Sequence, residues 1–421
     1  MRYRWSHRNH PQAIAERQAL LRQRPDWTEA DEWPFRWSVD PERLGRFQEC
    51  LTGEMVLPVG VVGPLLVSLG QYTIEDGGVA REVGRATDTV FVPLAHTEGG
   101  LSASMLRGMR AAEAAGGVRT YLLRDAMTRD SAFVFRTPAE AVALAEWVRS
   151  EEAGLVAWCN DPANPLKQPG GPGHPLPVMS QHARLLGVDT RVVGPVCHLL
   201  YRFWTGEACG PNMMTRNAYA LNRRVVELSR LVPDHVFLEA NLGGDKKPSH
   251  EYYAGGHGKT VLATVTLTHD VLRHHLHITA EALKTLEWVG LHGAHASAMQ
   301  SFGFTPASAV AAIFAATGQD LGMVGTSSMA QGSLHAVPEG ITFSLQLGGL
   351  EVGTVGGGTG LPHARAWLRM MGCEGPGSAQ RLAQIIAAAT LCLEVSAAAS
   401  MASRGSENFF RAHWERGGHR N

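Results

Sequence analysis

An alanine-rich apolar segment near the carboxyl end, Leu382–Met401, constrains the fold of this chain more than any other feature. It is long enough to cross a membrane, but it contains Gln384 and Glu394 and is rich in small residues. A helix of this kind is expected in the centre of a large core. The chain has 421 residues, 44% of them hydrophobic, which suffices for such a core and for more than one domain.

Interleaved strands and helices predict an α+β fold with one inserted domain. Residues 1–50 form a charged, tryptophan-rich helical arm, residues 51–130 and 239–421 a large domain, and residues 131–238 a small insert of the ferredoxin-like type. The predicted strands are Val56–Val67, Phe91–Leu94, Val118–Leu123, Ala132–Phe135, Val192–Trp204, Val236–Ala240, Lys259–Leu267 and Thr342–Leu347. The predicted helices are Gln12–Gln23, Pro41–Leu51, Leu101–Ala115, Pro138–Ser150, Met213–Leu231, Thr279–Leu286, Pro306–Thr317 and Ser378–Ser403, and Asn160–Pro177 is a Pro- and Gly-rich loop.

A polar loop, Phe237–Tyr253 (FLEANLGGDKKPSHEYY), is the first candidate for chemistry. Breakers such as Asn241 and Pro248 exclude regular structure, and the repulsion between Lys246 and Lys247 disfavours a helix. Lysine meets a developing oxyanion as a compact point charge, so the loop suits an anionic ligand or transition state. A solvated turn with two surface lysines is the alternative, and the loop taken alone favours it.

Three other side chains are candidates for acid–base chemistry. Glu98 lies between an apolar strand and two glycines, where a partly desolvated carboxyl could act as a general acid, or where a carboxylate could simply stabilise a helix dipole. Asp320 follows an apolar helix, a position unfavourable for a carboxylate unless a cation such as Lys246 meets it. His413 lies in the C-terminal tail, where it is either solvated or, if the tail folds over a site, an acid.

Three patterns suit phosphate-bearing ligands. Arg107 and Arg110 share a helical face, and Gly108 between them permits close approach, which suits a polyphosphate such as that of coenzyme A; a solvated helix face is the alternative. Gly206–Asn212 (GEACGPN) opens a helix after a strand, a suitable place for a dinucleotide pyrophosphate, although its spacing is not GxGxxG. Gly353–Thr359 (GTVGGGT) is either a second ligand-binding turn or a tight turn in the core.

Composition argues against several other functions. The net charge is −1 and the pI is near 7.0, which gives no support for a nucleic-acid or anionic-membrane partner. The 19 histidines show no HExxH motif and the six cysteines no paired CxxC or disulfide framework, so we expect no metal and reduced thiols. No apolar stretch follows the N-terminus, so the expected location is cytoplasmic.

In their order along the chain, these motifs resemble the 3-hydroxy-3-methylglutaryl-coenzyme A reductase family, in its statin-sensitive class I branch. The resemblance covers most of Glu49–Trp414. It rests on PVGVVGPL at 58–65, VPLAHTEGGLSASMLRGMRA at 92–111, DAMTR at 125–129, SQHARL at 180–185, TGEACGPNMMT at 205–215, NLGGDKKP at 241–248, GAHA at 293–296, ATGQD at 316–320, EVGTVGGGTGLP at 351–362 and RAHWER at 411–416.

The resemblance implies reduction of 3-hydroxy-3-methylglutaryl-coenzyme A to mevalonate and coenzyme A by two hydride transfers from NADPH, or less readily from NADH. It also implies a large domain for the acyl-coenzyme A, a small domain for the dinucleotide, and a homodimer or larger homo-oligomer with active sites between subunits. The catalytic residues implied are Glu98, Lys246, Asp320 and His413. Those implied for the substrate are Ser104, Arg107, Arg110, Arg129, Glu239, Asn241, Asp245, Lys247 and Ser308. Those implied for the cofactor are Ser180, Gln181, His182, Glu207, Ala208, Cys209, Gly210, Asn212, Gly356 and Gly357.

Some positions depart from the family pattern. Glu239 stands in place of a serine that contacts the acyl group, Ser308 in place of an asparagine, and Gln181 in place of the arginine that usually contacts the 2′-phosphate of NADP; Cys50, Glu207 and the residues after His413 also differ. These changes leave open a reductase of another acyl thioester, bound to coenzyme A or to a carrier protein. A non-catalytic relic of the fold is a third possibility, against which the joint presence of Glu98, Lys246 and Asp320 argues.

Overall fold

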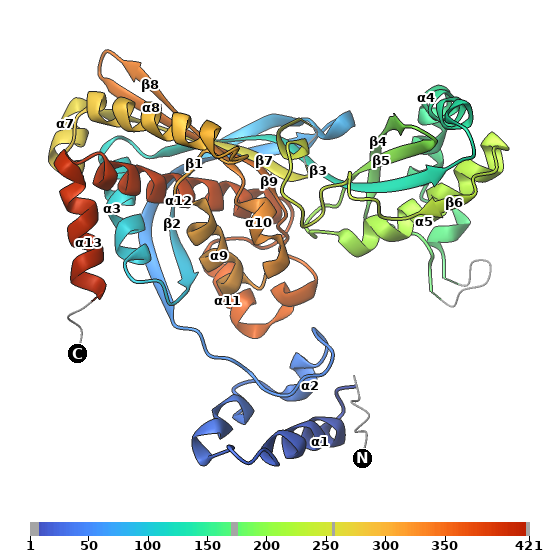
Figure 1. Ribbon diagram of the computed structural model, residues 1–421, viewed down its shortest axis with the longest axis horizontal. Helices are drawn as coiled ribbons and strands as arrows, with labels where there is room; N and C mark the ends of the chain where they lie inside the picture. Colours follow the sequence, from blue (N-terminus) through green and yellow to red (C-terminus); the bar gives the residue numbers. More distant parts are fainter. Residues whose placement is uncertain (1–7, 170–175, 255–256, 418–421) are drawn as a thin grey trace.

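The computed structural model describes residues 8–169, 176–254 and 257–417, and it confirms an α+β fold (Figure 1). The strands are β1 (Val59–Ile74), β2 (Ala80–Ala95), β3 (Val118–Val134), β4 (Arg184–Val193), β5 (Val196–Trp204), β6 (His235–Phe237), β7 (Gly258–Thr268), β8 (Ala330–Val337) and β9 (Gly340–Leu350). The α-helices are α1 (Pro11–Arg22), α2 (Pro41–Leu44), α3 (Leu101–Ala114), α4 (Pro138–Asn160), α5 (Pro211–Ser229), α6 (Glu251–Ala254), α7 (His269–Val271), α8 (Ala280–Ala296), α9 (Pro306–Thr317), α10 (Val324–Ser327), α11 (Pro362–Met370), α12 (Ser378–Met401) and α13 (Glu407–Gly417).

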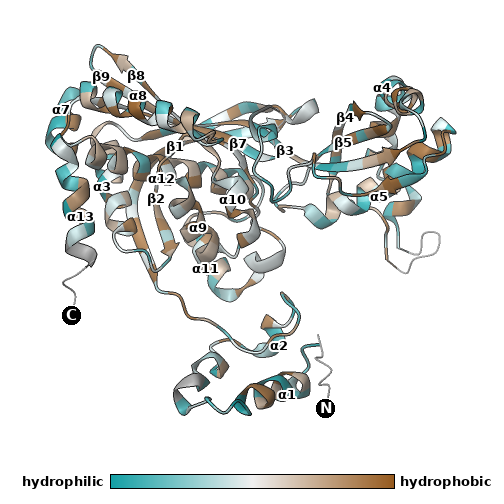
Figure 2. Ribbon diagram, in the orientation of Figure 1, coloured by the Kyte–Doolittle hydropathy of each residue, from teal (hydrophilic) through white to brown (hydrophobic). Residues whose placement is uncertain are grey.

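Helix α12 is the centre of the large domain. It packs against β1, β3, β7 and β9 of a sheet with the order β2-β1-β3-β7-β9-β8, and against α3 and α9. Among the described helices it alone is long and apolar enough to cross a membrane, but 94% of its apolar window is buried inside the protein. Figure 2 shows it as a mostly hydrophobic ribbon. The buried helix expected from the sequence is therefore confirmed.

The two polar residues of α12 are hydrogen-bonded within this core. The Gln384 side chain donates to the Gly70 carbonyl oxygen over 2.9 Å and accepts from the Gly70 N–H over 2.8 Å. The Glu394 carboxylate accepts from the Phe304 N–H over 3.0 Å and also from Thr305, at the start of α9. Burial of polar groups is tolerated when such partners are present, so each residue ties the helix to a neighbouring element.

Strand β3 joins the two domains. The sequence predicted two strands here, Val118–Leu123 and Ala132–Phe135, but the structure has one strand of 17 residues. Its first part pairs with β1 and β7, and its last part pairs with β5 and β6. The polar middle stays extended because its buried carboxylates find partners on neighbouring strands: Asp125 lies 3.1 Å from Lys259, and Asp130 lies 3.1 Å from His198.

The small domain has the element order β3-α4-β4-β5-α5-β6 and the strand order β4-β5-β3-β6, which is the ferredoxin-like arrangement. Its own apolar core lies between this sheet and α4 and α5. The strand predicted at Val192–Trp204 corresponds to β5 and the last two residues of β4; the rest of β4 was missed, and Gly194, with φ 58°, turns the chain between the two strands. The division at residues 131 and 238 stays a prediction, and its first limit falls within β3.

Other differences concern the edges of the molecule. The sequence predicted only Phe91–Leu94 of β2 and missed β8, because both are edge strands with many exposed residues and a weak apolar pattern. Helix Pro41–Leu51 shrinks to Pro41–Leu44, whereas α4 and α8 extend well beyond the predicted ends. In the predicted loop Asn160–Pro177, a 3-10 turn occupies Pro165–Lys167, and residues 170–175 lie outside the described part.

Candidate active site

The loop between β6 and α6 presents two adjacent lysines. Its backbone has positive φ at Gly244 (79°) and at Lys246 (58°), a region that few residues other than glycine adopt. Buried hydroxyls hold the loop: Thr128 Oγ1 donates to the Gly243 carbonyl oxygen over 2.7 Å, and the Tyr252 hydroxyl donates to that of Gly244 over 2.6 Å. Unusual backbone held in place by its surroundings is frequent at functional sites.

Lys246 forms an ion pair with Asp320, as the sequence predicted. The two atoms, Nζ and Oδ2, are 2.7 Å apart, and each side chain is close to half exposed. The hydrogen bond to Asp320 raises the pKa of the Lys246 ammonium above its ordinary value. Partial burial of Asp320 favours its protonated form, but the hydrogen bonds from Lys246 and from the Gly322 N–H outweigh burial and lower the pKa of Asp320. Both groups are therefore charged at neutral pH.

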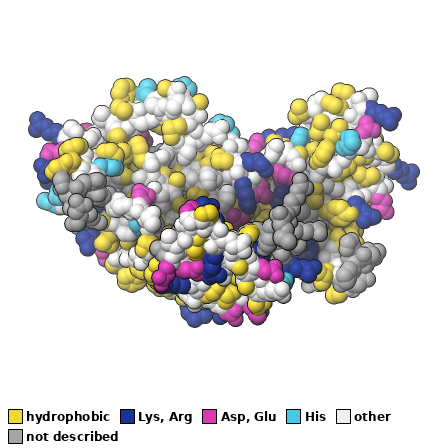
Figure 3. Space-filling view, turned by 60° about the horizontal axis from the view of Figure 1, so that its bottom comes forward, with side chains coloured by type: hydrophobic (Ala, Val, Ile, Leu, Met, Phe, Trp, Pro, Cys, Tyr) yellow, Lys and Arg dark blue, Asp and Glu magenta, His cyan; other side chains and the backbone are white. Residues whose placement is uncertain are grey.

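A second group of charges adjoins this pair. The Arg129 guanidinium contacts the carboxylates of Glu239 and Asp245, the latter over 3.0 Å, and Lys247 Nζ lies 3.2 Å from Glu239. All of them belong to the loop or to β3. Figure 3 shows basic and acidic side chains side by side in the middle of one face, between the two lobes. The structure thus brings together four of the nine residues that the resemblance implied for the substrate: Arg129, Glu239, Asp245 and Lys247.

A buried polar network supports the loop from behind. Glu351 is 1% exposed, and its carboxylate lies 2.9 Å from the Tyr252 hydroxyl and 3.2 Å from His257 Nε2. His257 Nδ1 in turn lies 2.6 Å from Thr128 Oγ1. Ligand atoms of Asp245, His257 and Glu351 lie within 4.8 Å of one another. Because His257 and Glu351 are engaged with protein groups, we assign this cluster to support of the loop rather than to metal binding.

A cleft of about 1190 Å³ opens beside Asp320, between the two domains. It is larger than most small-molecule pockets and suits a ligand as long as a dinucleotide. Nearly all the residues that the sequence assigned to the cofactor line it: Gln181, His182, Glu207, Ala208, Cys209, Gly210, Asn212, Gly356 and Gly357. Ser180 lies behind them, where its hydroxyl oxygen accepts from the His182 N–H over 3.1 Å.

The cleft walls fit a nicotinamide dinucleotide. Helix α5, of 19 residues, begins there after Gly210, so its unpaired N–H groups and dipole favour a phosphate. Gly356 and Gly357 have φ of 87° and 53°, and a Cβ atom on either would meet nothing within 4 Å. The sequence did not identify two aromatic residues that line the cleft, Phe47 and Trp204. Phe47 belongs to the N-terminal arm, which carries no local signal of a ligand.

Glu207 has a structural task at the edge of this cleft. Its carboxylate accepts from the N–H groups of Gly377 and Ala379, each over 2.7 Å, and from the Ser378 hydroxyl over 3.0 Å. These groups form the first turn of α12, so the carboxylate caps the helix and interacts favourably with its dipole. Glu207 therefore fixes the central helix to the cleft wall.

The other five residues predicted for the substrate are divided between contacts with α12 and exposed or half-buried positions. Ser104 and Arg107 bond to α12: their Oγ and Nε atoms lie 2.9 and 3.0 Å from Ser396 Oγ. Gly108 gives close approach to α12, not to a ligand, because a Cβ there would lie 1.7 Å from the Cys392 carbonyl oxygen. Arg110 is exposed on the same helix, Ser308 lies half-buried in the first turn of α9, and Asn241 is exposed in the loop.

The chain does not bring Glu98 and His413 to the Lys246–Asp320 pair. Glu98 is exposed between β2 and α3, and within the described residues it makes no hydrogen bond or ion pair. His413 lies on α13, where its Nδ1 is 2.8 Å from the Phe409 carbonyl oxygen and its ring is 4.3 Å from the Phe409 ring. Figure 1 shows α13 at the end of the molecule opposite the small domain.

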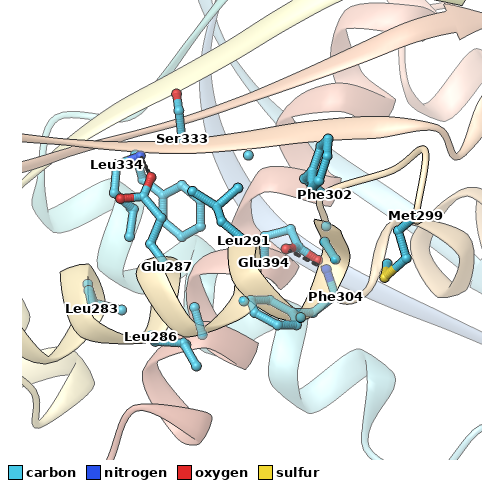
Figure 4. A pocket seen from close by; sticks show the side chains of 17 residues that line it. Leu283, Leu286, Glu287, Leu291, Met299, Phe302, Phe304, Ser333, Leu334 and Glu394 are labelled. Atoms are coloured by element: carbon cyan, nitrogen blue, oxygen red, sulfur yellow. Dashed lines mark hydrogen bonds between the residues drawn. The ribbon is translucent and has the colours of Figure 1, made fainter. Parts of the chain in front are cut away.

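A second cavity, of about 290 Å³, lies between α8, α12 and β8 (Figure 4). Its lining is mainly apolar and includes Leu286, Leu291 and Phe302. The two carboxylates in its wall are engaged: Glu394 caps the start of α9, and Glu287 accepts from the Leu334 N–H over 2.7 Å. The described lining therefore offers no group for acid–base chemistry, and the cleft beside Asp320 is the better candidate site.

Comparison with known proteins assigns the family. The family model described as hydroxymethylglutaryl-coenzyme A reductase matches residues 13–417. The 3-hydroxy-3-methylglutaryl-coenzyme A reductase of Pyrococcus abyssi is 32% identical over 387 residues, covering 90% of this chain and 86% of that protein. That of Haloferax volcanii is 34% identical over 362 residues, covering 85% and 82%.

Saccharomyces cerevisiae 3-hydroxy-3-methylglutaryl-coenzyme A reductase 2 is 32% identical over 386 residues, which cover 89% of this chain but 34% of the yeast protein. Among solved structures, the class II enzyme from Streptococcus pneumoniae bound to NADPH has a TM-score of 0.64 at 18% identity, covering 92% of this chain and 97% of that one. This likeness supports the fold. On the extent and identity of these matches, the chain belongs to the hydroxymethylglutaryl-coenzyme A reductase family.

Proposed function

We propose that this chain reduces 3-hydroxy-3-methylglutaryl-coenzyme A to mevalonate and coenzyme A, with NADPH as the preferred hydride donor. The observation that carries the proposal is the Lys246–Asp320 pair, 2.7 Å apart, at the wall of a cleft that fits a dinucleotide. The test is oxidation of NADPH and NADH by the purified protein, followed by absorbance, with this thioester as substrate. Cofactor oxidation that depends on the thioester supports the proposal; a protein that binds cofactor but never turns over opposes it.

Each of the proposed catalytic side chains has a separate role in the reduction of the thioester. The cofactor, when bound in the cleft, supplies a hydride to the carbonyl carbon in each of two steps. Lys246 stabilises the negative charge that develops on the carbonyl oxygen, and Asp320 holds the ammonium in place and charged. Glu98 donates the proton that this oxygen takes up, and His413 protonates the departing coenzyme A thiolate. Arg129 and Lys247, which both contact Glu239, are the cations that we assign to the free carboxylate of the acyl group.

Asp320→Asn should change the pH dependence of turnover. Asp320 raises the pKa of Lys246, so the active ammonium persists until the pH rises through that elevated value. Asparagine removes this effect, and the alkaline decline of kcat/KM should move to lower pH, with an overall loss of roughly ten- to a hundred-fold. In the parent protein the pair should be lost on the acid side, as the pH falls through the lowered pKa of Asp320. An unshifted alkaline decline in the variant would contradict this role for Asp320.

The separation of Glu98 and His413 from Lys246 leads us to propose a homodimer with shared sites, in which Glu98 and His413 act with the Lys246 of the other subunit. Glu98→Gln and Lys246→Ala should each be inactive alone. If the two residues act from different subunits, a mixed dimer of the variants contains one intact site, and refolding an equal mixture should restore about one quarter of the parent turnover. If both act from the same subunit, every site carries one defect and mixing restores nothing. The recovered NADPH oxidation rate distinguishes the two arrangements.

A further inference from the structure

The Glu239 carboxylate, in the loop between β6 and α6, occupies a site that suits an anion. Its Oε1 atom accepts from Lys247 Nζ over 3.2 Å and from the Asn241 N–H over 3.0 Å, and its Oε2 atom contacts the Arg129 guanidinium. Arg129 is almost buried, with 8% of its side chain exposed, whereas 34% of Glu239 is exposed. Two cations and a backbone donor converge on a position that solvent, and hence a ligand, can reach.

The charges of this cluster balance. Arg129, Lys246 and Lys247 contribute three positive charges, and their partners Glu239, Asp245 and Asp320 contribute three negative ones. An acyl group with a free carboxylate would bring a fourth negative charge into a neutral cluster. Coulomb attraction for that carboxylate is therefore weaker than it would be if Arg129 and Lys247 faced an empty subsite.

Arg129 does not depend on Glu239 for a partner. Asp245 Oδ2 lies 3.0 Å from the other terminal nitrogen of the guanidinium, and Asp245 Oδ1 is buried without a hydrogen bond. If the Glu239 carboxylate were absent, Arg129 would stay paired with Asp245. The guanidinium nitrogen that now contacts Glu239 would become available to a ligand. The Glu239 carboxylate therefore occupies the position between Arg129 and Lys247, but it is not needed to hold Arg129 in place.

We propose that Glu239 determines specificity at the acyl end of the substrate: it competes with the substrate's free carboxylate for Arg129 and Lys247. The proposal rests on the proposed function, because that function places the carboxylate of the hydroxymethylglutaryl group at these cations. It follows that the parent protein binds an anionic acyl end more weakly than its cations permit. Thioesters with an uncharged acyl end experience no such competition.

Glu239→Gln tests the proposal, because the amide keeps the shape of the side chain and removes its charge. Dissociation constants are measured by calorimetry for 3-hydroxy-3-methylglutaryl-coenzyme A, for butyryl-coenzyme A, which has no distal carboxylate, and for coenzyme A. The variant should bind the first ligand roughly five-fold more tightly or better, a gain that shrinks at high salt, and the other two as the parent does. Glu251→Gln is the matched control: it neutralises a carboxylate paired with Arg191 over 2.6 Å in an ion pair that includes none of the cluster residues, and it should change none of the three constants.

The possible results separate this proposal from the proposed function. Unchanged or weaker binding of the carboxylated thioester by Glu239→Gln, in a protein that turns it over, would overturn the role of Glu239 alone. Tighter binding by the variant, in a parent protein that shows no turnover with this thioester, would support the role of Glu239 and oppose the proposed function. If neither protein discriminates the carboxylated thioester from coenzyme A, the role of Glu239 is overturned, and turnover alone decides the proposed function. Thermal unfolding of the variant checks that it is folded.

Discussion

Replacing Lys246 with alanine is expected to lower kcat for 3-hydroxy-3-methylglutaryl-coenzyme A by roughly a hundred- to a thousand-fold. Removal of one positioned donor to a developing oxyanion typically costs about this much in kcat. The Lys246 ammonium lies 2.7 Å from Asp320, which keeps it charged and fixed. Alanine removes the charge and leaves the Asp320 carboxylate without its cation, so the local field opposes the negative transition state.

Steady-state NADPH oxidation measures this effect, and cofactor binding, followed by fluorescence, shows whether the variant is folded. Lys284→Ala is the matched control, since Lys284 and Lys246 are similarly exposed, 44% and 47%, and Lys284 also pairs with a carboxylate. Its turnover should stay within about two-fold of the parent value, as for most surface substitutions. A Lys246→Ala protein that kept kcat within ten-fold would remove Lys246 from the chemistry.

Gly108→Ala is expected to destabilise the protein by about 3 to 5 kcal/mol, which is a large part of the stability of a typical domain. A Cβ atom at residue 108 would lie 1.7 Å from the carbonyl oxygen and 2.5 Å from the carbonyl carbon of Cys392. Both atoms belong to the backbone of α12, and no side-chain rotation can relieve the clash. Because α12 is packed on nearly all sides, α3 and α12 must separate, and the core loses contacts.

Urea unfolding at equilibrium gives the change in free energy. Gly293→Ala provides the comparison: this glycine lies on an exposed part of α8, and a Cβ there would meet nothing within 4 Å. Alanine restricts the unfolded chain and favours the helix, so that variant should be more stable by about 0.5 to 1 kcal/mol. A loss of less than about 1 kcal/mol in Gly108→Ala would mean that the two helices separate easily.

The amino-acid sequence alone determined those features of the protein that depend on residues close together in the chain. The composition of α12 requires burial, and the breakers around Asp245-Lys246-Lys247 require a loop. The unfavourable position of Asp320 at the end of an apolar helix indicated a cation partner, and the structure supplies Lys246 over 2.7 Å. Each inference follows from a property of adjacent residues: their apolar content, their backbone freedom or their charge.

Only the tertiary structure decided the rest, because it depends on partners distant in the chain. The polar middle of β3 stays in a strand because Lys259 pairs with Asp125 and the His198 ring contacts Asp130, and these partners lie far from β3 in the sequence. Gly108 contacts α12 rather than a phosphate because α3 and α12 cross there. The crossing brings Gly108 against Cys392, which lies 284 residues further along the chain. The sequence did not indicate a partner for the Glu239 carboxylate, and the structure pairs it with Arg129. Contacts across the chain, with the burial and charge balance that they impose, set the properties of this site.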